Sequence, residues 1–350
     1  MKVLHLLSSN RFSGAENVVC QIMDMFKDDE NIEMVYCSPD GQIRESLKDK
    51  NVTFAPISEI SVKEVRSAIK QVKPDLIHAH DMRASFIAAR ACEKVPFVSH
   101  VHNNNFDSRG LSFKSLAYLY AGLKARHVFW VSKSSFNGYV FHNVLKKKST
   151  VLYNVVNVDE LYKKMNLDNA DYSYDLIYVG RLTYPKNPER FVDLIKRIVG
   201  KRQNTKVAIV GTGELEDSVK TLVNNYGLMR NVDFLGFQSN PLKILHDSKI
   251  MILTSRWEGT PMCALEAMAL GVPIVSTPTD GMNDLIQNGI NGFLSDSDDE
   301  LCDRILDLLG DENLWRKLSA AQMEKSKLIN DCLKYRRKIL EVYTSSLLKK

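Results

Sequence analysis

Two glutamates, Glu258 and Glu266, stand eight positions apart, and a helix start is predicted between them. Thr260 is a good N-cap, Pro261 suits the first helical position and Gly271 suits the C-terminal cap. Glu258 is therefore expected in the preceding loop, and Glu266 about a turn and a half inside the helix. Unbonded N–H groups at a helix start attract anions, and here they would belong to a pocket lined by Gly259, Thr260, Pro261, Met262 and Cys263. Carboxylates that bind hydroxyls beside a phosphate pocket are what a sugar nucleotide requires.

Two cations follow a predicted strand about eighty residues earlier in the chain. The apolar run at 176–179 leads into Gly180 and Arg181, and Lys186 comes shortly after. At the carboxyl end of a strand, Arg181 and Lys186 would neutralise a diphosphate, and the arginine could do so with two parallel hydrogen bonds. Taken alone, the segment also fits a solvated surface turn.

Glycines follow two further predicted strands. Gly211 and Gly213 end the strand near 206–211, where they allow either close backbone approach to a ligand or a tight turn. The third glycine and the acidic residue of a dinucleotide fingerprint are missing, which counts against NAD. Gly14 stands between the first strand and an apolar helix, where it either admits a phosphate or acceptor group or serves packing.

Four histidines end two predicted strands in the first half of the chain. His78 and His80 close one strand, and His100 and His102 close another. We expect the first three to be hydrogen-bonded histidines of the core or of the cleft wall rather than metal ligands, and His102, the last residue out of its strand, to be functional. Asp296 and Asp298 match an Asp-x-Asp metal motif, but they precede a helix and are better explained by capping.

The chain alternates short β-branched runs with helical patterns, which predicts α/β architecture with parallel sheets. At 350 residues it is long for one core, and we expect two Rossmann-like domains facing across a cleft. The predicted strands lie near 2–8, 32–37, 52–55, 75–80, 97–101, 127–131, 149–153, 174–180, 206–211, 231–236, 249–254 and 272–276. The polar stretch at 163–172 is the expected linker. Six scattered cysteines and the absence of a long apolar run predict a cytoplasmic protein with reduced thiols.

Positive charge is concentrated in the first half of the chain. The net charge is +5, and residues 1–165 hold 23 Lys and Arg against 17 Asp and Glu. The aromatic segment from Phe113 to Trp130 carries lysines and precedes the run Lys146 to Lys148. It could contact an anionic membrane surface or the phosphates of an acceptor, although aromatic residues in such a segment are more often core. No recognition motif supports nucleic-acid binding.

Taken together, these residues resemble the family 4 retaining glycosyltransferases of the GT-B fold. The resemblance is strongest from 174 to 294, and its most specific elements are Glu258-x7-Glu266, Gly180-Arg181-Leu182 with Lys186-Asn187, and His102. It implies that Arg181 and Lys186 hold the donor diphosphate, that Glu258 contacts the transferred sugar, that Glu266 contacts the ribose, and that His102 lies beside the reacting sugar. Gly14 would belong to the phosphate-contacting N-terminal loop.

The resemblance also implies an activity and a division of labour. The expected function is metal-independent transfer of a sugar from a nucleotide diphosphate to a saccharide or lipid-linked saccharide, with no cofactor and with UDP favoured over GDP. Residues 1–165 would bind the acceptor, residues 166–325 the donor, and the helix at 326–350 would pack on the first domain. A peripheral position on the inner face of the plasma membrane and a role in polysaccharide biosynthesis fit this activity. The alternatives are a nucleotide-sugar epimerase or hydrolase of the same fold and a non-catalytic sugar-nucleotide-binding subunit.

Four places depart from the family pattern. The segment Asn154-Val155-Val156-Asn157 replaces the common Asn-Gly-Val-Asp, so a different turn is expected there. Ser13 precedes Gly14 where two glycines are usual, Asp280 precedes Gly281 where a glycine pair is usual, and Asp284 stands at a common glutamate position. None of them belongs to the expected diphosphate clamp, so they bear on sugar and acceptor specificity.

Overall fold

The computed structural model describes residues 1–92, 94–102 and 108–348, and it divides the chain into two compact units. The first unit comprises residues 1–154 together with 332–350, and the second comprises residues 155–331. Among the described residues, no helix combines the length and the apolar character that crossing a bilayer would need.

The first unit is built on a six-stranded parallel sheet. Its strands, in the order β2-β1-β3-β4-β5-β6, are β1 Lys2–Leu6, β2 Glu33–Cys37, β3 Leu76–His80, β4 Phe97–Val101, β5 His127–Trp130 and β6 Ser149–Val151. Because side chains alternate along a strand, Ile77 and Ala79 enter the core formed with α3, α4 and α5, whereas His78 and His80 point to the opposite face. The strand order reverses between β1 and β3.

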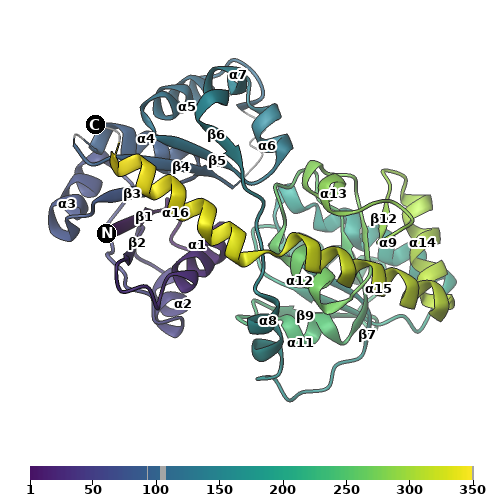
Figure 1. Cartoon of the computed structure of the whole chain (residues 1–350). Coiled ribbons are helices and arrows are strands. Elements are labelled where there is room, and N and C mark those ends of the chain that lie inside the picture. Colours follow the sequence, from purple (N-terminus) through teal and green to yellow (C-terminus); the bar gives the residue numbers. More distant parts are fainter. Residues whose placement is uncertain (93, 103–107, 349–350) are drawn as a thin grey trace. The chain divides into compact units, whose positions relative to one another are not determined.

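The helices of this unit lie on both faces of the sheet (Figure 1). They are α1 Gly14–Met25, α2 Ile43–Asp49, α3 Val62–Val72, α4 Asp81–Ala91, α5 Phe113–Lys124, α6 Lys133–Gly138, α7 His142–Leu145, the 3-10 turn η2 Lys146–Lys148, and α16 Cys332–Leu348. The last helix, α16, lies against β3 and β4 and beside α1. Its Tyr343 hydroxyl is 2.7 Å from Nδ1 of His78, so the C-terminal helix covers the histidine face of the sheet.

The second unit contains a parallel sheet of order β12-β11-β10-β7-β8-β9. Its strands are β7 Tyr174–Val179, β8 Val207–Val210, β9 Val232–Gly236, β10 Ser248–Leu253, β11 Ile274–Ser276 and β12 Phe293–Leu294. The chain starts in the middle of the sheet at β7, proceeds outward to β9, and returns to the other side at β10. Ligands of such sheets bind at this reversal, beyond the carboxyl ends of the two central strands.

Helices cover both faces of this sheet (Figure 1). They are α8 Val158–Met165, η3 Tyr184–Lys186, α9 Pro188–Lys201, α10 Glu216–Asn225, α11 Leu242–His246, α12 Met262–Leu270, α13 Asp280–Leu285, α14 Asp298–Gly310 and α15 Glu312–Ile329. The buried core between β7, β8, β10, α9 and α14 is mostly aliphatic. Its two buried aromatic residues among those described, Tyr178 and Phe191, have ring centroids 5.2 Å apart.

The α/β fold with two parallel sheets is confirmed, but some boundaries differ from the sequence prediction. Residues 52–55 form no strand and pair through an isolated bridge between Phe54 and Tyr36, and β12 was not predicted. The compact units separate after Asn154 rather than after residue 165, because α8 packs on α11 and the Tyr162 hydroxyl donates to the Ala269 carbonyl. The return to the first unit comes at Cys332 rather than at 326.

One glycine of the second unit permits an unusually close approach of two backbone segments. A Cβ atom added at Gly281 in α13 would lie 1.4 Å from the carbonyl oxygen of Gly259. We expect Gly281→Ala to lower the thermal midpoint by several degrees, since a clash with backbone can be relieved only by moving α13.

Gly200→Ala is the matched control. It lies in α9 with no atom within 4 Å of the added Cβ, and it should stabilise the protein by about 0.5–1 kcal/mol through helix propensity. Differential scanning calorimetry measures both variants. A Gly281→Ala protein as stable as the wild type would contradict the close approach.

Candidate functional site

The segments that follow β7 and β10 are joined by hydrogen bonds at the point where the strand order reverses. The Thr254 hydroxyl donates to the Asn187 carbonyl at 2.9 Å, and the Arg256 backbone N–H donates to the Pro185 carbonyl at 2.8 Å. The Arg256 guanidinium also donates to the Tyr184 carbonyl at 2.6 Å and lies over the Tyr184 ring. The two segments therefore form one connected edge of the sheet.

Glu258 is fixed in this edge by two donors to the same oxygen. Lys186 Nζ and Ser255 Oγ both donate to Glu258 Oε1, the hydroxyl at 2.7 Å. The Ser255 carbonyl in turn accepts from Thr277 Oγ1 at 2.7 Å. Glu258 Oε2 has no hydrogen-bond partner among the described residues. A side chain that is 9% exposed thus keeps one anchored oxygen and one open acceptor.

Lys186 and Arg181 supply the positive charge of the site. Burial pushes the pKa of Lys186 down, but the carboxylate of Glu258 outweighs burial, and the pKa lies above its ordinary value. Of the three Nζ protons, the described structure uses one, for Glu258. Arg181 is exposed, and its guanidinium has no partner among the described residues. Both predicted cations therefore retain donors for an anion.

Helix α12 starts one residue later than expected. Pro261, in an extended conformation, occupies the N-cap position that was assigned to Thr260, and no side chain caps the helix. The backbone N–H groups of Met262 and Cys263 remain without a partner among the described residues, since the Pro261 carbonyl accepts only from Ala264 and Leu265. The predicted anion-attracting helix start is present, and Gly271 ends the helix with φ 72°.

The charges of the site converge on Cys263. Burial raises the pKa of its thiol to about 12, and Lys186, Glu258 and Glu266 all act on it electrostatically. The thiol is therefore neutral at pH 7 and adds no charge to the site. The structure thus brings Lys186, Glu258 and Glu266 around the start of α12.

The predicted glycines fall into two groups. A Cβ at Gly211, which has φ +132°, would lie 2.0 Å from the Gly180 carbonyl, and one at Gly213 would lie 2.2 Å from the Leu182 carbonyl. Close approach of the two loops accounts for glycine at both positions, and a contact of Gly180 or Gly211 with the donor stays a prediction. Gly14, at the start of α1, has no atom within 4 Å of an added Cβ, so packing does not explain it.

The first unit brings five histidines together on one face of its sheet. His5 is opposite His78 in the register of β1 and β3, and His80 is opposite His100 in β3 and β4. His102 follows β4 directly, and its ring centroid is 4.2 Å from that of His100. All five side chains are buried. His5 was not singled out in the sequence. It lies between the buried Leu4 and Leu6 in β1, so strand alternation places its side chain on the opposite face of the sheet from theirs.

Hydrogen bonds connect three of these histidines in a row. His5 Nδ1 is 3.0 Å from His80 Nε2, and His80 Nδ1 is 2.8 Å from His102 Nε2. Two nitrogens on one tetrahedral zinc ion would be about 3.3 Å apart. The shorter separations are those of nitrogens that share a proton. Nitrogens of two histidine triads lie within 4.8 Å of one another. The prediction of hydrogen-bonded histidines is confirmed for His78 and His80. It is wrong for His100, because neither of its ring nitrogens has a partner among the described residues.

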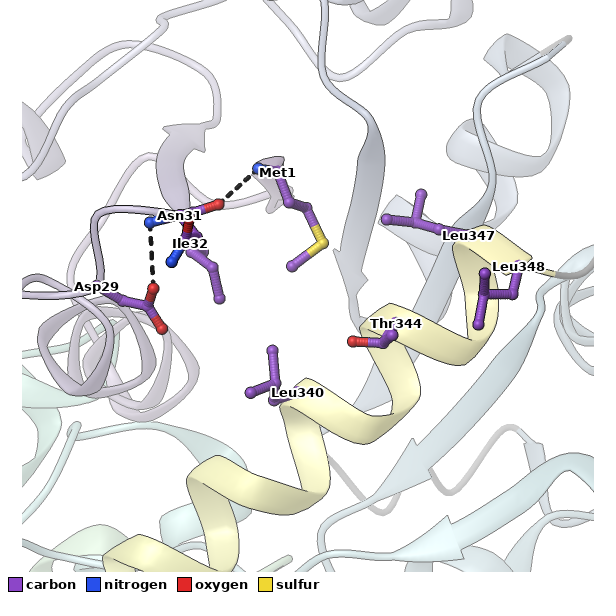
Figure 2. Close-up of a pocket in the computed structure, with 8 residues that line it drawn as sticks. All are labelled: Met1, Asp29, Asn31, Ile32, Leu340, Thr344, Leu347 and Leu348. Atoms are coloured by element: carbon purple, nitrogen blue, oxygen red, sulfur yellow. Dashed lines mark hydrogen bonds between the residues drawn. The ribbon is translucent and has the colours of Figure 1, made fainter.

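A cavity of about 420 Å³ in the first unit is unrelated to these residues. Figure 2 shows it between the first residue of the chain, the turn at 29–32 and the last turns of α16. The amino group of Met1 donates to the Asn31 carbonyl at 2.6 Å. Met1 precedes β1, so the cavity lies at the amino ends of the strands, opposite to the edge where ligands of parallel sheets bind.

The aromatic, basic segment divides into core and surface. Tyr118, Phe129 and Trp130 are fully buried. One side of α5 is exposed and apolar, at a spacing of three or four residues, through Phe113, Leu116, Tyr120 and Leu123. Lys124 lies with its Nζ 4.8 Å from the centre of the Tyr120 ring. The sequence did not separate these two sets, because both follow helical or strand periodicity.

Sequence reasoning missed Ser255 and the pairing of Lys186 with Glu258. A serine three residues before a glutamate in a loop is an available signal for Ser255, because short polar side chains commonly bond nearby groups in loops. The pairing carries no local signal, since its partners are 72 residues apart in sequence.

Two family models match consecutive parts of the chain. The model of glycosyltransferase family 4 matches residues 12–160, and the model of glycosyl transferases group 1 matches residues 159–325. The junction lies close to the boundary of the compact units at residues 154–155.

Similar proteins share this organisation. An uncharacterised glycosyltransferase of Methanocaldococcus jannaschii is 31% identical over 252 residues, an alignment covering 66% of this chain and 62% of that protein. The UDP-Gal:α-D-GlcNAc-diphosphoundecaprenol α-1,3-galactosyltransferase of Escherichia coli is 27% identical, with 85% of each chain covered. The crystal structure of Anabaena HepE in complex with UDP and glucose superposes with a TM-score of 0.83 at 21% identity, covering 99% of this chain and 100% of that one.

The family models together span residues 12–325, and the structural similarity extends over both units. The chain belongs to the family 4 glycosyltransferases and has the GT-B fold of two Rossmann-like domains.

Proposed function

We propose that this chain transfers a sugar, with retention of anomeric configuration and without a metal, from a UDP-sugar to a hydroxyl of a saccharide or lipid-linked saccharide. The observation that carries the proposal is the arrangement at the carboxyl ends of β7 and β10, where Lys186 and Glu258 are paired and Arg181 has no described partner. The names of the Escherichia coli relative and of the Anabaena complex support UDP as the nucleotide. The lipid-linked acceptor in the relative's name supports the same acceptor class.

In this proposal the second unit binds the donor. Arg181, two protons of Lys186 Nζ and the N–H groups that start α12 neutralise the diphosphate. Glu266 binds the ribose, and the open Oε2 of Glu258 accepts from a hydroxyl of the transferred sugar. His102 contacts that sugar from the first unit, which binds the acceptor. Gly14 would belong to the phosphate-contacting loop.

The reaction needs stabilisation of a leaving group. The bond from the sugar's anomeric carbon to the phosphate oxygen breaks, negative charge builds up on the diphosphate, and the acceptor oxygen bonds to the same face of the sugar. The acceptor proton passes to the departing phosphate oxygen. Arg181, Lys186 and the α12 dipole act on the charge that develops in the transition state, which is where fixed charges accelerate a reaction.

Arg181→Ala tests the diphosphate clamp. We expect kcat to fall by about 10²–10³, since one donor to the developing charge is removed. Arg316→Ala, which removes an exposed arginine paired with Glu312 on the surface of α15, should leave kcat within about twofold. Release of UDP from a UDP-sugar with a saccharide acceptor is measured. Wild-type turnover in Arg181→Ala would refute the clamp, and sugar release without any acceptor would indicate a hydrolase or epimerase.

Thermal unfolding with UDP, GDP, ADP and their sugar conjugates, in the presence of EDTA, tests the donor. A nucleotide at about 100 times its Kd should stabilise the protein by about 2.7 kcal/mol. We expect the shift with UDP and UDP-sugars, and a smaller one in Glu266→Ala because the ribose contact is lost. A shift with GDP alone would overturn the UDP assignment. A shift that needs a divalent metal would overturn metal independence.

We further propose that the apolar side of α5 docks on an anionic membrane, where a lipid-linked acceptor would lie. Its exposed residues Phe113, Leu116 and Leu123 could enter the interface while neighbouring lysines contact anionic headgroups. The lysine run at 146–148 adds charge beside it, although Lys148 Nζ itself binds the carbonyls that end α5.

Leu123→Ser should weaken binding to phosphatidylglycerol-containing vesicles by about tenfold, because one apolar side chain no longer enters the interface. The matched control is Leu328→Ser, which changes an exposed leucine of α15 outside this surface and should bind as the wild type does. Vesicle co-sedimentation at low and high salt measures both. Equal binding of the two variants, or no binding of the wild type at low salt, would refute docking through α5.

A further inference from the structure

His5, His80 and His102 in the first unit form a row connected by two hydrogen bonds, with His5 and His102 at its ends. His80 lies in the middle and uses both ring nitrogens, bonding His5 Nδ1 with Nε2 and His102 Nε2 with Nδ1. The outer nitrogens, His5 Nε2 and His102 Nδ1, are buried and have no partner among the described residues. The backbone N–H of His102 donates to Asp81 Oδ1 at 2.9 Å, which fixes the end of the row in place.

The number of protons in this row is determined. Burial lowers the pKa of His5 and of His102 to about 3, and burial together with the neighbouring rings lowers that of His80. Each ring is therefore neutral at pH 7 and carries one N–H proton. Two of the three protons occupy the two hydrogen bonds. The third must lie at one of the two ends.

Only two arrangements satisfy both hydrogen bonds. Either all three rings are protonated at Nδ1, and His102 Nδ1 is a donor, or all three are protonated at Nε2, and His102 Nδ1 is an acceptor. Any mixed arrangement places two N–H groups or two lone pairs against each other at 2.8–3.0 Å. The tautomer of His102 is thus coupled to that of His5 through His80.

In the free protein each arrangement leaves one buried N–H group without a described partner, at His102 Nδ1 in the first and at His5 Nε2 in the second. A ligand hydroxyl at His102, which is 7% exposed whereas His5 is fully buried, favours the first arrangement. Protonation at Nε2 would leave an N–H group of His5 buried without an acceptor, and orphaned N–H groups are rarer in proteins than under-satisfied acceptors. Protonation at Nδ1 leaves only a lone pair at His5. In this arrangement the third N–H group is that of His102 Nδ1, which can donate to a ligand oxygen.

We propose that His80 and His5 are positioning residues that hold His102 as an Nδ1–H donor toward a hydroxyl oxygen of the transferred sugar. The sugar as ligand rests on the proposed function, whereas the coupling of the three rings rests on their geometry alone. The arrangement requires no proton transfer during the reaction. When the sugar is bound, the coupling through His80 and His5 leaves Nδ1 of His102 as the donating atom.

NMR of wild-type protein labelled with ¹⁵N in the histidine rings and saturated with a UDP-sugar tests the coupling, because protonated and unprotonated ring nitrogens have distinct shifts. We expect His5, His80 and His102 all to be protonated at Nδ1 and unprotonated at Nε2. Protonation of His102 at Nε2, or different tautomers in the three rings, would overturn the proposal.

Variants separate positioning from structural effects. His80→Phe removes both hydrogen bonds, so His102 should lose its single Nδ1–H state in the spectrum, and kcat/KM should fall by about tenfold, the effect of one neutral hydrogen bond. His100→Phe is the matched control, since His100 is equally buried and lies 4.2 Å from the His102 ring but makes no hydrogen bond through either nitrogen among the described residues. It should leave the His102 tautomer unchanged.

The outcomes distinguish this proposal from the activity on which it rests. An active wild type with His102 protonated at Nε2 would reject the positioning role alone. An inactive protein with all three rings protonated at Nδ1 would reject glycosyl transfer and leave the coupling. If His80→Phe and His100→Phe changed the His102 signals equally, packing rather than hydrogen bonding would control the tautomer, and the proposal would fail.

Discussion

The second unit depends on the ion pair between Lys186 and Glu258. The two residues belong to segments that follow different strands, and both side chains are largely withdrawn from water, with 20% and 9% exposed. Either charge alone in that position would cost several kcal/mol, because desolvation would be uncompensated. The segments after β7 and β10 must therefore stay together. The hydrogen bonds of Thr254 and Arg256 to the 184–187 turn also hold these two segments together.

The pairing of Lys186 with Glu258 also explains how positively charged side chains can lie close together before an anion is bound. A cluster of unpaired cations would repel itself, as the effect of Arg181 in lowering the pKa of Lys186 indicates. Glu258 offsets that repulsion through one oxygen and leaves the second oxygen open. When a diphosphate supplies negative charge, Lys186 gains a second partner instead of exchanging one for another. The positive charge is thus positioned before binding, which favours fixed electrostatic stabilisation of a leaving group.

The sequence predicted the parts of this arrangement that repeat or are local. Alternating β-branched and helical runs indicated the strands, and Thr260 to Gly271 indicated α12 to within one residue at its start. It could not predict β12, which at two residues is too short to form a recognisable run, nor the unit boundary, because α8 is polar in sequence but packs on α11. The pairing of Lys186 with Glu258 could not be predicted from the sequence for a different reason. Each residue was assigned a ligand separately, and only the folded edge shows that they are each other's partner.

The first unit also places polar side chains out of contact with water, but its buried histidines are neutral rather than charged. Charged histidines at His5, His80 and His102 would repel one another in a buried row, so burial removes their charge and hydrogen bonds replace ion pairs. Neutral imidazoles have one donor and one acceptor each, which gives the row a direction that an ion pair lacks. His100, whose two nitrogens have no described partner, lies outside the row and has no such direction. A histidine that is to present one defined atom to a ligand therefore needs a neighbour such as His80, and stacking alone cannot supply it.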